Sequence, residues 1–262
     1  MSIAASIDNL SPVQRLMYRQ APDAGFFQAF TAAYAGYGEA AGAATQATGP
    51  AGTASAADRL LADLLGQTHA ELSRRRGVGA EDQAAYADIL NRAYTSGGML
   101  DPVGFLNELS REELAVVQRN HCLADPIQPA GLSREGAYNL LLPEGYAVDF
   151  NHDDLVETGA GRSIQFPPAD APAEFVDAWF KATRDMSEMD AASYGLALFT
   201  GMHTIPVDGQ PMRRTLDAGS MGSYRKVVAG YLDMLENFKG QLAEGQYERD
   251  KAFFGRLQDL LG

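Results

Sequence analysis

The sequence has few of the residues that build disulfides, zinc sites and nucleic-acid interfaces. Its 262 residues include one cysteine, Cys122, and four histidines. A single cysteine excludes an intrachain disulfide and a zinc site built from several thiolates. Lys and Arg total 21 against 34 Asp and Glu, which gives a formal net charge of −13 and a pI of about 4.7. Because this charge repels phosphate backbones and anionic bilayers, we expect neither a nucleic acid nor a membrane as a partner.

Long apolar runs and a targeting segment are also lacking. No run of about 18 apolar residues occurs, and residues 1–10 contain no Lys or Arg that would begin a secretory signal. We therefore expect a soluble protein without a signal peptide or transmembrane segment, in a compartment that the sequence does not specify. Apolar residues make up 46% and charged residues 21% of the chain, the composition of a globular protein with a sizeable core.

Composition divides the chain into three parts. Residues 36–57 hold one charged residue, no branched aliphatic residue and many small ones. This stretch is predicted to be a flexible linker, because it cannot bury enough apolar surface to offset the entropy of ordering it. It separates an N-terminal helical segment, 1–35, from a main helical domain, 58–262. The N-terminal segment has an apolar helical face and then an aromatic one, and these faces either dock on the main domain or bind another protein.

Helical periodicity dominates the main domain. Apolar residues repeat at three- and four-residue steps over 60–72, 86–94, 175–183, 224–238 and 253–261. Ser110 and Glu113 have the spacing of a capping box, which marks a helix start. We therefore predict a mainly α-helical, bundle-like domain. Residues 143–172 are rich in Pro and Gly and are predicted to form an embedded acidic loop region, with a short β-hairpin near residues 163–166.

The most distinctive local pattern is the sequence DFNHDDLVE at residues 149–157. Asp149, Asn151 and Asp153 alternate, which brings three oxygen-bearing side chains to one side of a tight loop. Ca²⁺ takes about six to eight oxygen ligands, and the carbonyl of Leu155 and the carboxylate of Glu157 would extend the set. From 143 to 161 there are five acidic residues and no Lys or Arg. Because unneutralised carboxylates repel one another, a bound cation would explain such a cluster.

This stretch resembles the calcium-binding loop of EF-hand and EF-hand-like proteins. Asp149, Asn151 and Asp153 match the first, third and fifth positions of that loop. Leu155 stands at the seventh position, which contributes a carbonyl, and Glu157 stands at the ninth. The resemblance covers at most about twelve residues of the chain and implies a structural Ca²⁺ site.

The sequence departs from the EF-hand pattern at two positions. Asp154 replaces the glycine of the sharp turn, and Ala160 stands where a bidentate Glu normally closes the site. A calcium site here would therefore be weak or completed by a remote carboxylate such as Asp170 or Glu144. The alternative is a turn rich in Asp and Asn, whose side chains accept hydrogen bonds from backbone N–H groups.

Nucleophilic and zinc chemistry have less support in the sequence. Cys122 follows His121 directly, and on a helix their side chains would point about 100° apart. Only His203 or His69 could then serve the thiol as a base. The four histidines lack the spacing of a helical zinc site. We interpret Cys122 as a small buried hydrophobic residue.

The sequence thus favours a non-enzymatic interaction or structural protein with a structural Ca²⁺ site and a protein partner or a homo-oligomeric state. The alternative is a hydrolase of unknown substrate, with its cleft near the acidic loop or near Cys122 and His203. A structure can separate these two functions. A binding module has an exposed apolar groove, whereas an enzyme has a pocket that converges on Cys122, a histidine or several carboxylates.

Overall fold

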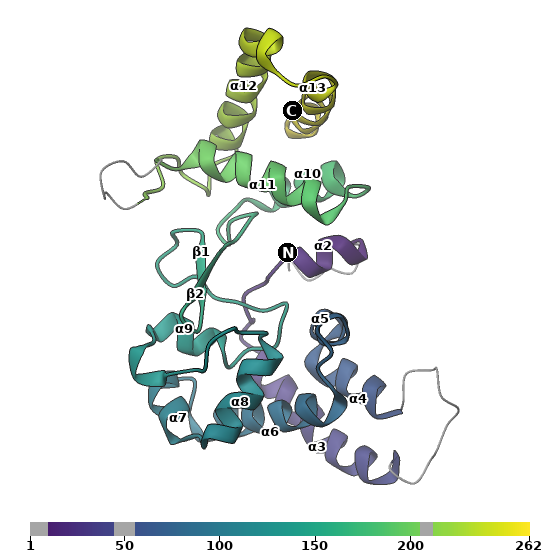
Figure 1. Cartoon of the computed structure of the whole chain (residues 1–262), viewed down its shortest axis with the longest axis vertical. Coiled ribbons are helices and arrows are strands. Elements are labelled where there is room, and N and C mark those ends of the chain that lie inside the picture. The colour runs from purple at the N-terminus through teal and green to yellow at the C-terminus, as the bar shows by residue number, and fades with distance from the viewer. Residues whose placement is uncertain (1–9, 45–55, 205–211) are drawn as a thin grey trace. The chain divides into compact units, whose positions relative to one another are not determined.

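The structure is a computed structural model that describes residues 10–44, 56–204 and 212–262. These residues are mainly α-helical, as the periodicity predicted, and they contain one small antiparallel hairpin (Figure 1). The hairpin consists of β1 (Leu155–Thr158) and β2 (Gly161–Ile164). The predicted hairpin region is therefore confirmed, with its second strand beginning two residues earlier than the β-like run at 163–166.

The chain divides into two compact units, each with its own hydrophobic core. Unit 1 comprises the described parts of residues 1–18, 151–154 and 164–262, and unit 2 comprises the described parts of residues 19–150 and 155–163. This division crosses the boundaries suggested by composition, because the N-terminal segment contributes to both units. The part of the predicted linker between 45 and 55 lies outside the described residues.

Unit 2 is built around one long buried helix. Its elements are α3 (Phe26–Ala44), α4 (Ala56–Leu65), α5 (Gln67–Arg76), α6 (Ala80–Ser96), α7 (Pro102–Glu108), α8 (Arg111–Asn120), the 3₁₀ helix η1 (Pro129–Gly131), α9 (Arg134–Asn139) and the hairpin up to residue 163. Helices α3, α4 and α8 all pack on α6. The α6 side chains Tyr86, Leu90 and Ala93 are completely buried, so α6 forms the centre of this unit.

Local signals explain where several helices of unit 2 begin and end. The capping box is confirmed, because Ser110 Oγ accepts from the N–H of Glu113 at 3.2 Å and the Glu113 carboxylate accepts from the N–H of Ser110 at 2.8 Å. The periodic run over 60–72 forms two helices, α4 and α5, because Gly66 between them has φ +93°. Helix α3 continues to Ala44. Residues 36–44 include several alanines, and alanine has the highest helix propensity of all residues, which favours this continuation.

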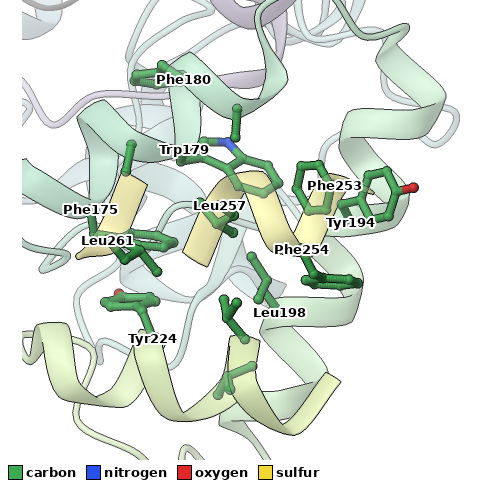
Figure 2. Packing of buried hydrophobic residues seen from close by; sticks show 14 of the residues in the cluster. Phe175, Trp179, Phe180, Tyr194, Leu198, Tyr224, Phe253, Phe254, Leu257 and Leu261 are labelled. Carbon is green, nitrogen blue, oxygen red and sulfur yellow. The ribbon is translucent and has the colours of Figure 1, made fainter. Parts of the chain in front are cut away.

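Unit 1 is a set of helices around an aromatic core. Its elements are α2 (Pro12–Met17), α10 (Ala173–Thr183), α11 (Glu188–Met202), α12 (Met221–Phe238), the 3₁₀ helix η2 (Lys239–Gln241) and α13 (Gln246–Leu261). Figure 2 shows the side chains of α10, α11, α12 and α13 that meet in this core. The ring of Phe175 stacks on Tyr224 with centroids 3.5 Å apart, and Tyr194 stacks on Phe253 at 3.8 Å. Helices α12 and α13 pack together.

Both apolar faces of the N-terminal segment dock within the chain. Leu10 is 5% exposed in the core of unit 1, and Gln14 of α2 donates from Nε2 to the carbonyl of Phe180 at 2.7 Å. In unit 2, Phe30 of α3 is 4% exposed and packs edge-on against Tyr94 of α6. The docking interpretation of these faces is therefore confirmed.

Candidate functional site

The five predicted calcium ligands are divided between the two units. Asn151 and Asp153 belong to unit 1, whereas Asp149, Leu155 and Glu157 belong to unit 2. Asn151 Oδ1 accepts from the N–H of Asp153 at 3.0 Å, and its amide group donates to the Asp153 carboxylate at 3.1 Å. These two bonds are the pattern of a turn in which an Asn side chain binds the backbone two residues on.

Two acidic residues of this region have arginine partners, one nearby in the sequence and one distant. Glu157 accepts from Arg162 Nε at 2.7 Å, and Glu144 accepts from Arg76 at 2.6 Å. The charge of each of these two carboxylates is therefore balanced by an arginine. Among the described residues, no group of three or more His, Cys, Asp and Glu side chains is arranged to hold a metal ion. Calcium binding stays a prediction that rests on the sequence.

A buried ionic cluster lies in unit 1 around Asp154, which is 1% exposed and has φ +65°. Arg214 binds its carboxylate through two nitrogens and also binds Asp170 at 2.7 Å. His203 donates from Nδ1 to the carbonyl of Phe199 at 2.7 Å, and its Nε2 lies 3.2 Å from the Asp154 carboxylate. Burial alone would lower the pKa of His203, but the Asp154 carboxylate and the Phe199 carbonyl outweigh it and raise the pKa. The cluster fixes the segment 151–154 to the end of α11.

A second buried polar cluster joins α5, α6 and α8 in unit 2. His69 is completely buried, and its Nδ1 accepts from the backbone N–H of Glu144 at 3.1 Å. Its Nε2–H therefore donates to Asn120 Oδ1 at 3.2 Å, which fixes the neutral tautomer. Burial, with the nearby ring of His121, lowers the pKa of His69 to about 4. His121 Nε2 lies 2.9 Å from the hydroxyl of Tyr86. The hydrogen bonds of these side chains are made within the unit.

The interpretation of Cys122 as a buried hydrophobic residue is wrong. Cys122 is exposed and has φ +52°, because α8 ends at Asn120 and the chain turns sharply there. His203 belongs to unit 1 and Cys122 to unit 2. Both nitrogens of His203 face oxygen atoms, those of Phe199 and Asp154, rather than a thiol.

An apolar groove lies on unit 1, with a volume of about 290 Å³. Its walls come from α2 and the residue after it, from α10 and α11, and from the end of β2 and the segment that follows. None of its lining residues carries a charge: Gln14, Met17, Tyr18, Ile164, Phe166, Trp179, Phe180, Thr183, Ala191, Ala192, Gly195 and Leu196. The volume is near the lower end of the range for small-ligand pockets.

Apolar side chains also surround the mouth of this groove. Leu196 is 49% exposed and Ile164 is 40% exposed. Met189 is 79% exposed and precedes Leu196 by seven residues, so both lie on the same side of α11. The exposed apolar surface thus continues from the groove along α11.

Polar groups within the groove differ in whether they are already bonded. The Gln14 amide donates to Thr183 Oγ1 at 2.9 Å, and that hydroxyl donates to the carbonyl of Trp179 at 2.8 Å. Trp179 is 5% exposed, and its indole N–H has no hydrogen bond in the described part of the chain. The indole is therefore a donor that a ligand in the groove can use.

Two other cavities, each of about 620 Å³, lie on unit 2. One lies along α4, α5 and the start of α6, and charged residues such as Asp63 and Arg74 contribute to its lining. The other is lined by residues between 123 and 132 and by the hairpin turn 159–161. Neither lining includes a histidine or Cys122. The first lining does include the carboxylates of Asp58, Asp63 and Glu71, which lie beside Arg59 and Arg74.

Comparison with protein-family models, with curated proteins and with solved structures finds no match to this chain. In the described part of the chain, no helix has both the length and the apolar character needed to cross a bilayer.

Proposed function

We propose that this protein is a binding module rather than an enzyme, and that the groove of unit 1 is its binding site. The observation that supports the proposal is a concave surface whose lining is free of charge and includes the exposed side chains of Leu196 and Ile164, with Met189 exposed on the same side of α11. Burying such surface against an apolar ligand releases the water in contact with it, which favours association by about 25 cal/mol per Å² before the costs of ordering.

The ionisable clusters support a structural role for the buried charges. His203 and Asp154 in unit 1 are 7% and 1% exposed, and His69 in unit 2 is completely buried. The bonds of His203 lie within unit 1, which carries the groove, and those of His69 lie within unit 2, so each histidine helps to hold its own unit together. The hydrolase alternative stays a prediction from the sequence, as does the structural Ca²⁺ site. A Ca²⁺ site would make the Tm of the wild type rise with calcium concentration. The Tm of the double variant Asp149→Ala plus Asp153→Ala would then not depend on calcium.

The chain contains one tryptophan, Trp179, and that residue lines the groove. Its emission therefore reports on the occupancy of the groove. We expect a neutral naphthylamine dye, whose fluorescence rises in apolar surroundings, to bind with a stoichiometry of about one. Its absorption overlaps tryptophan emission, so binding quenches Trp179 by energy transfer.

A pair of matched variants locates the dye. Leu196→Glu introduces a charge at the groove, and Met234→Glu introduces the same charge at an exposed apolar position of α12, where Met234 is 40% exposed. We expect Leu196→Glu to weaken dye binding about tenfold or more and Met234→Glu to leave it unchanged. Equal dye affinity in the two variants would contradict the proposal.

A further inference from the structure

We infer that the natural occupant of the groove is a positively charged amphipathic helix of a protein partner. The inference rests on the proposed function and adds the chemical class of the ligand. Three observations carry it: the scarcity of free hydrogen-bonding groups in the groove, the spacing of apolar residues along α11, and the charge of the segment that forms most of the groove.

A helix suits the groove because its backbone is already hydrogen-bonded. An extended peptide would bring N–H and C=O groups into apolar surroundings, where unpaired groups are costly. The side-chain amide of Gln14 and the hydroxyl of Thr183 already form hydrogen bonds within the unit. The backbone groups of α10 and α11 are bonded within these helices, so few of them are free to pair with a peptide. A helix presents only side chains to such a surface, and Trp179 offers one donor for a polar side chain among them.

The spacing of exposed residues on α11 matches the side of a partner helix. Met189, Ala192 and Leu196 stand at positions i, i+3 and i+7, which form one strip about 10 Å long. Ala192 is exposed and has only a methyl side chain, so a second helix can approach this strip closely. Amphipathic helices that bind grooves use the same i, i+3, i+4 and i+7 spacing for their anchors.

The charge around the groove favours a cationic partner. Eight charged residues lie between Ile164 and Thr204, and six of them are acidic. This segment supplies all the groove residues except those of α2 and Tyr18. Asp185 and Asp190 are both exposed and flank Met189 in the sequence. A net charge of −13 on the whole chain also attracts a cationic partner over longer distances.

The test uses three 18-residue peptides without tryptophan or tyrosine, titrated into the full chain while the emission of Trp179 is recorded. The first contains Leu and Lys with all Leu on one helical face. The second has the same composition in an order that has no apolar face, and the third has Glu in place of each Lys. We expect the first peptide to bind at least about tenfold more tightly than either of the others, and to bind several-fold more weakly when NaCl rises from 50 to 500 mM.

The matched variants separate groove binding from general attraction between opposite charges. Leu196→Glu and Met234→Glu each add one negative charge, so any non-specific attraction changes equally in both. We expect the first peptide to lose about tenfold in affinity for Leu196→Glu relative to Met234→Glu. Equal affinities of this peptide for the two variants would overturn the inference.

Other results assign the groove differently. If the naphthylamine dye binds the groove and none of the peptides does, the helical partner is wrong and the proposed function stands. If neither dye nor peptide binds, both proposals fail. Self-association in sedimentation velocity that Leu196→Glu abolishes and Met234→Glu preserves would identify a second copy of the chain as the occupant, and would overturn the partner inference.

Discussion

Two buried histidines show how position alone decides the behaviour of one residue type. His69 accepts a backbone N–H at Nδ1, and its burial outweighs the nearby carboxylate of Glu144, so it is held neutral and its pKa is lowered to about 4. His203 donates from Nδ1 to a carbonyl and faces the carboxylate of Asp154, so its pKa rises despite burial. The two residues therefore make stability depend on pH in opposite directions.

His69 makes unit 2 sensitive to acid. Its folded pKa of about 4 lies below the value of 6.5 that applies in the unfolded chain. The unfolded chain therefore takes up the proton first, and stability falls as pH falls from 6.5 toward 4. We expect a loss of roughly 2–3 kcal/mol between pH 7 and pH 4.5 from this residue. Urea unfolding of the wild type and His69→Gln at both pH values measures it, and an unchanged pH dependence in the variant would contradict the assignment.

His203 makes unit 1 sensitive to alkali. Its folded pKa is raised above 6.5, so its contribution is fully present below pH 6.5 and is lost as pH rises through the folded pKa. We expect the free energy of unfolding of the wild type to contain a fall between pH 6 and pH 9 that His203→Gln lacks. Hydrogen exchange of α11 at the two pH values assigns the effect to unit 1. A fall of the same size in the variant would show that another group titrates.

At the scale of elements, the sequence predicted helix starts better than helix breaks. Ser110 accepts a hydrogen bond from the N–H three residues on, as the sequence indicated, and Ser133 and Ser187 do the same at the starts of α9 and α11. A cap is a local interaction, so a few residues specify it. The apolar spacing of 60–72 continues through Gly66, and nothing in that spacing shows that the backbone adopts φ +93° there.

Helix α9 and the hairpin depend on a close approach of two glycines. The N–H of Gly159 donates to the carbonyl of Gly136 at 2.9 Å, and a Cβ added at Gly136 would lie 2.1 Å from the carbonyl oxygen of Gly159. Alanine is the better helix former, but this collision outweighs the gain. We expect Gly136→Ala to lower the free energy of unfolding by about 2–3 kcal/mol.

The control for this substitution is Gly131→Ala, also in unit 2. Nothing lies within 4 Å of a Cβ added at Gly131. We expect its effect to stay within about 0.5 kcal/mol. Thermal melts of both variants compare the two sites, and equal Tm values would refute the close approach of α9 and the hairpin.

At the scale of the whole molecule, the mainly helical class followed from the sequence, and the groove did not. The stripe at 175–183 was correctly predicted to be apolar, but Phe175 lies in the core whereas Trp179 also lines the groove. Periodicity identifies the apolar face of a helix, but it does not identify which other helix packs against that face. The groove joins residues 14–18 to residues 164–196, and that pairing depends on tertiary contacts that no local pattern contains.

The ion pairs of the molecule also depend on tertiary contacts that no local pattern contains. The acidic region around 143–161 suggested unneutralised charge, yet Glu144 pairs with Arg76 and Asp154 with Arg214, more than fifty residues away in each case. Within the region itself, Glu157 pairs with Arg162, which lies just beyond the stretch that the sequence singled out. Charge balance is therefore a property of the fold that local composition does not reveal.

The central claim, that a ligand binds in the groove of unit 1, is tested most directly by hydrogen exchange with and without a saturating concentration of the naphthylamine dye. Binding to the folded groove opposes local opening of its walls, so exchange there slows in proportion to ligand occupancy. We predict slower exchange in α2 and in residues 185–197, and unchanged exchange in α6 and α8 of unit 2. Protection of unit 2 with none in α2 and α11 would contradict the claim.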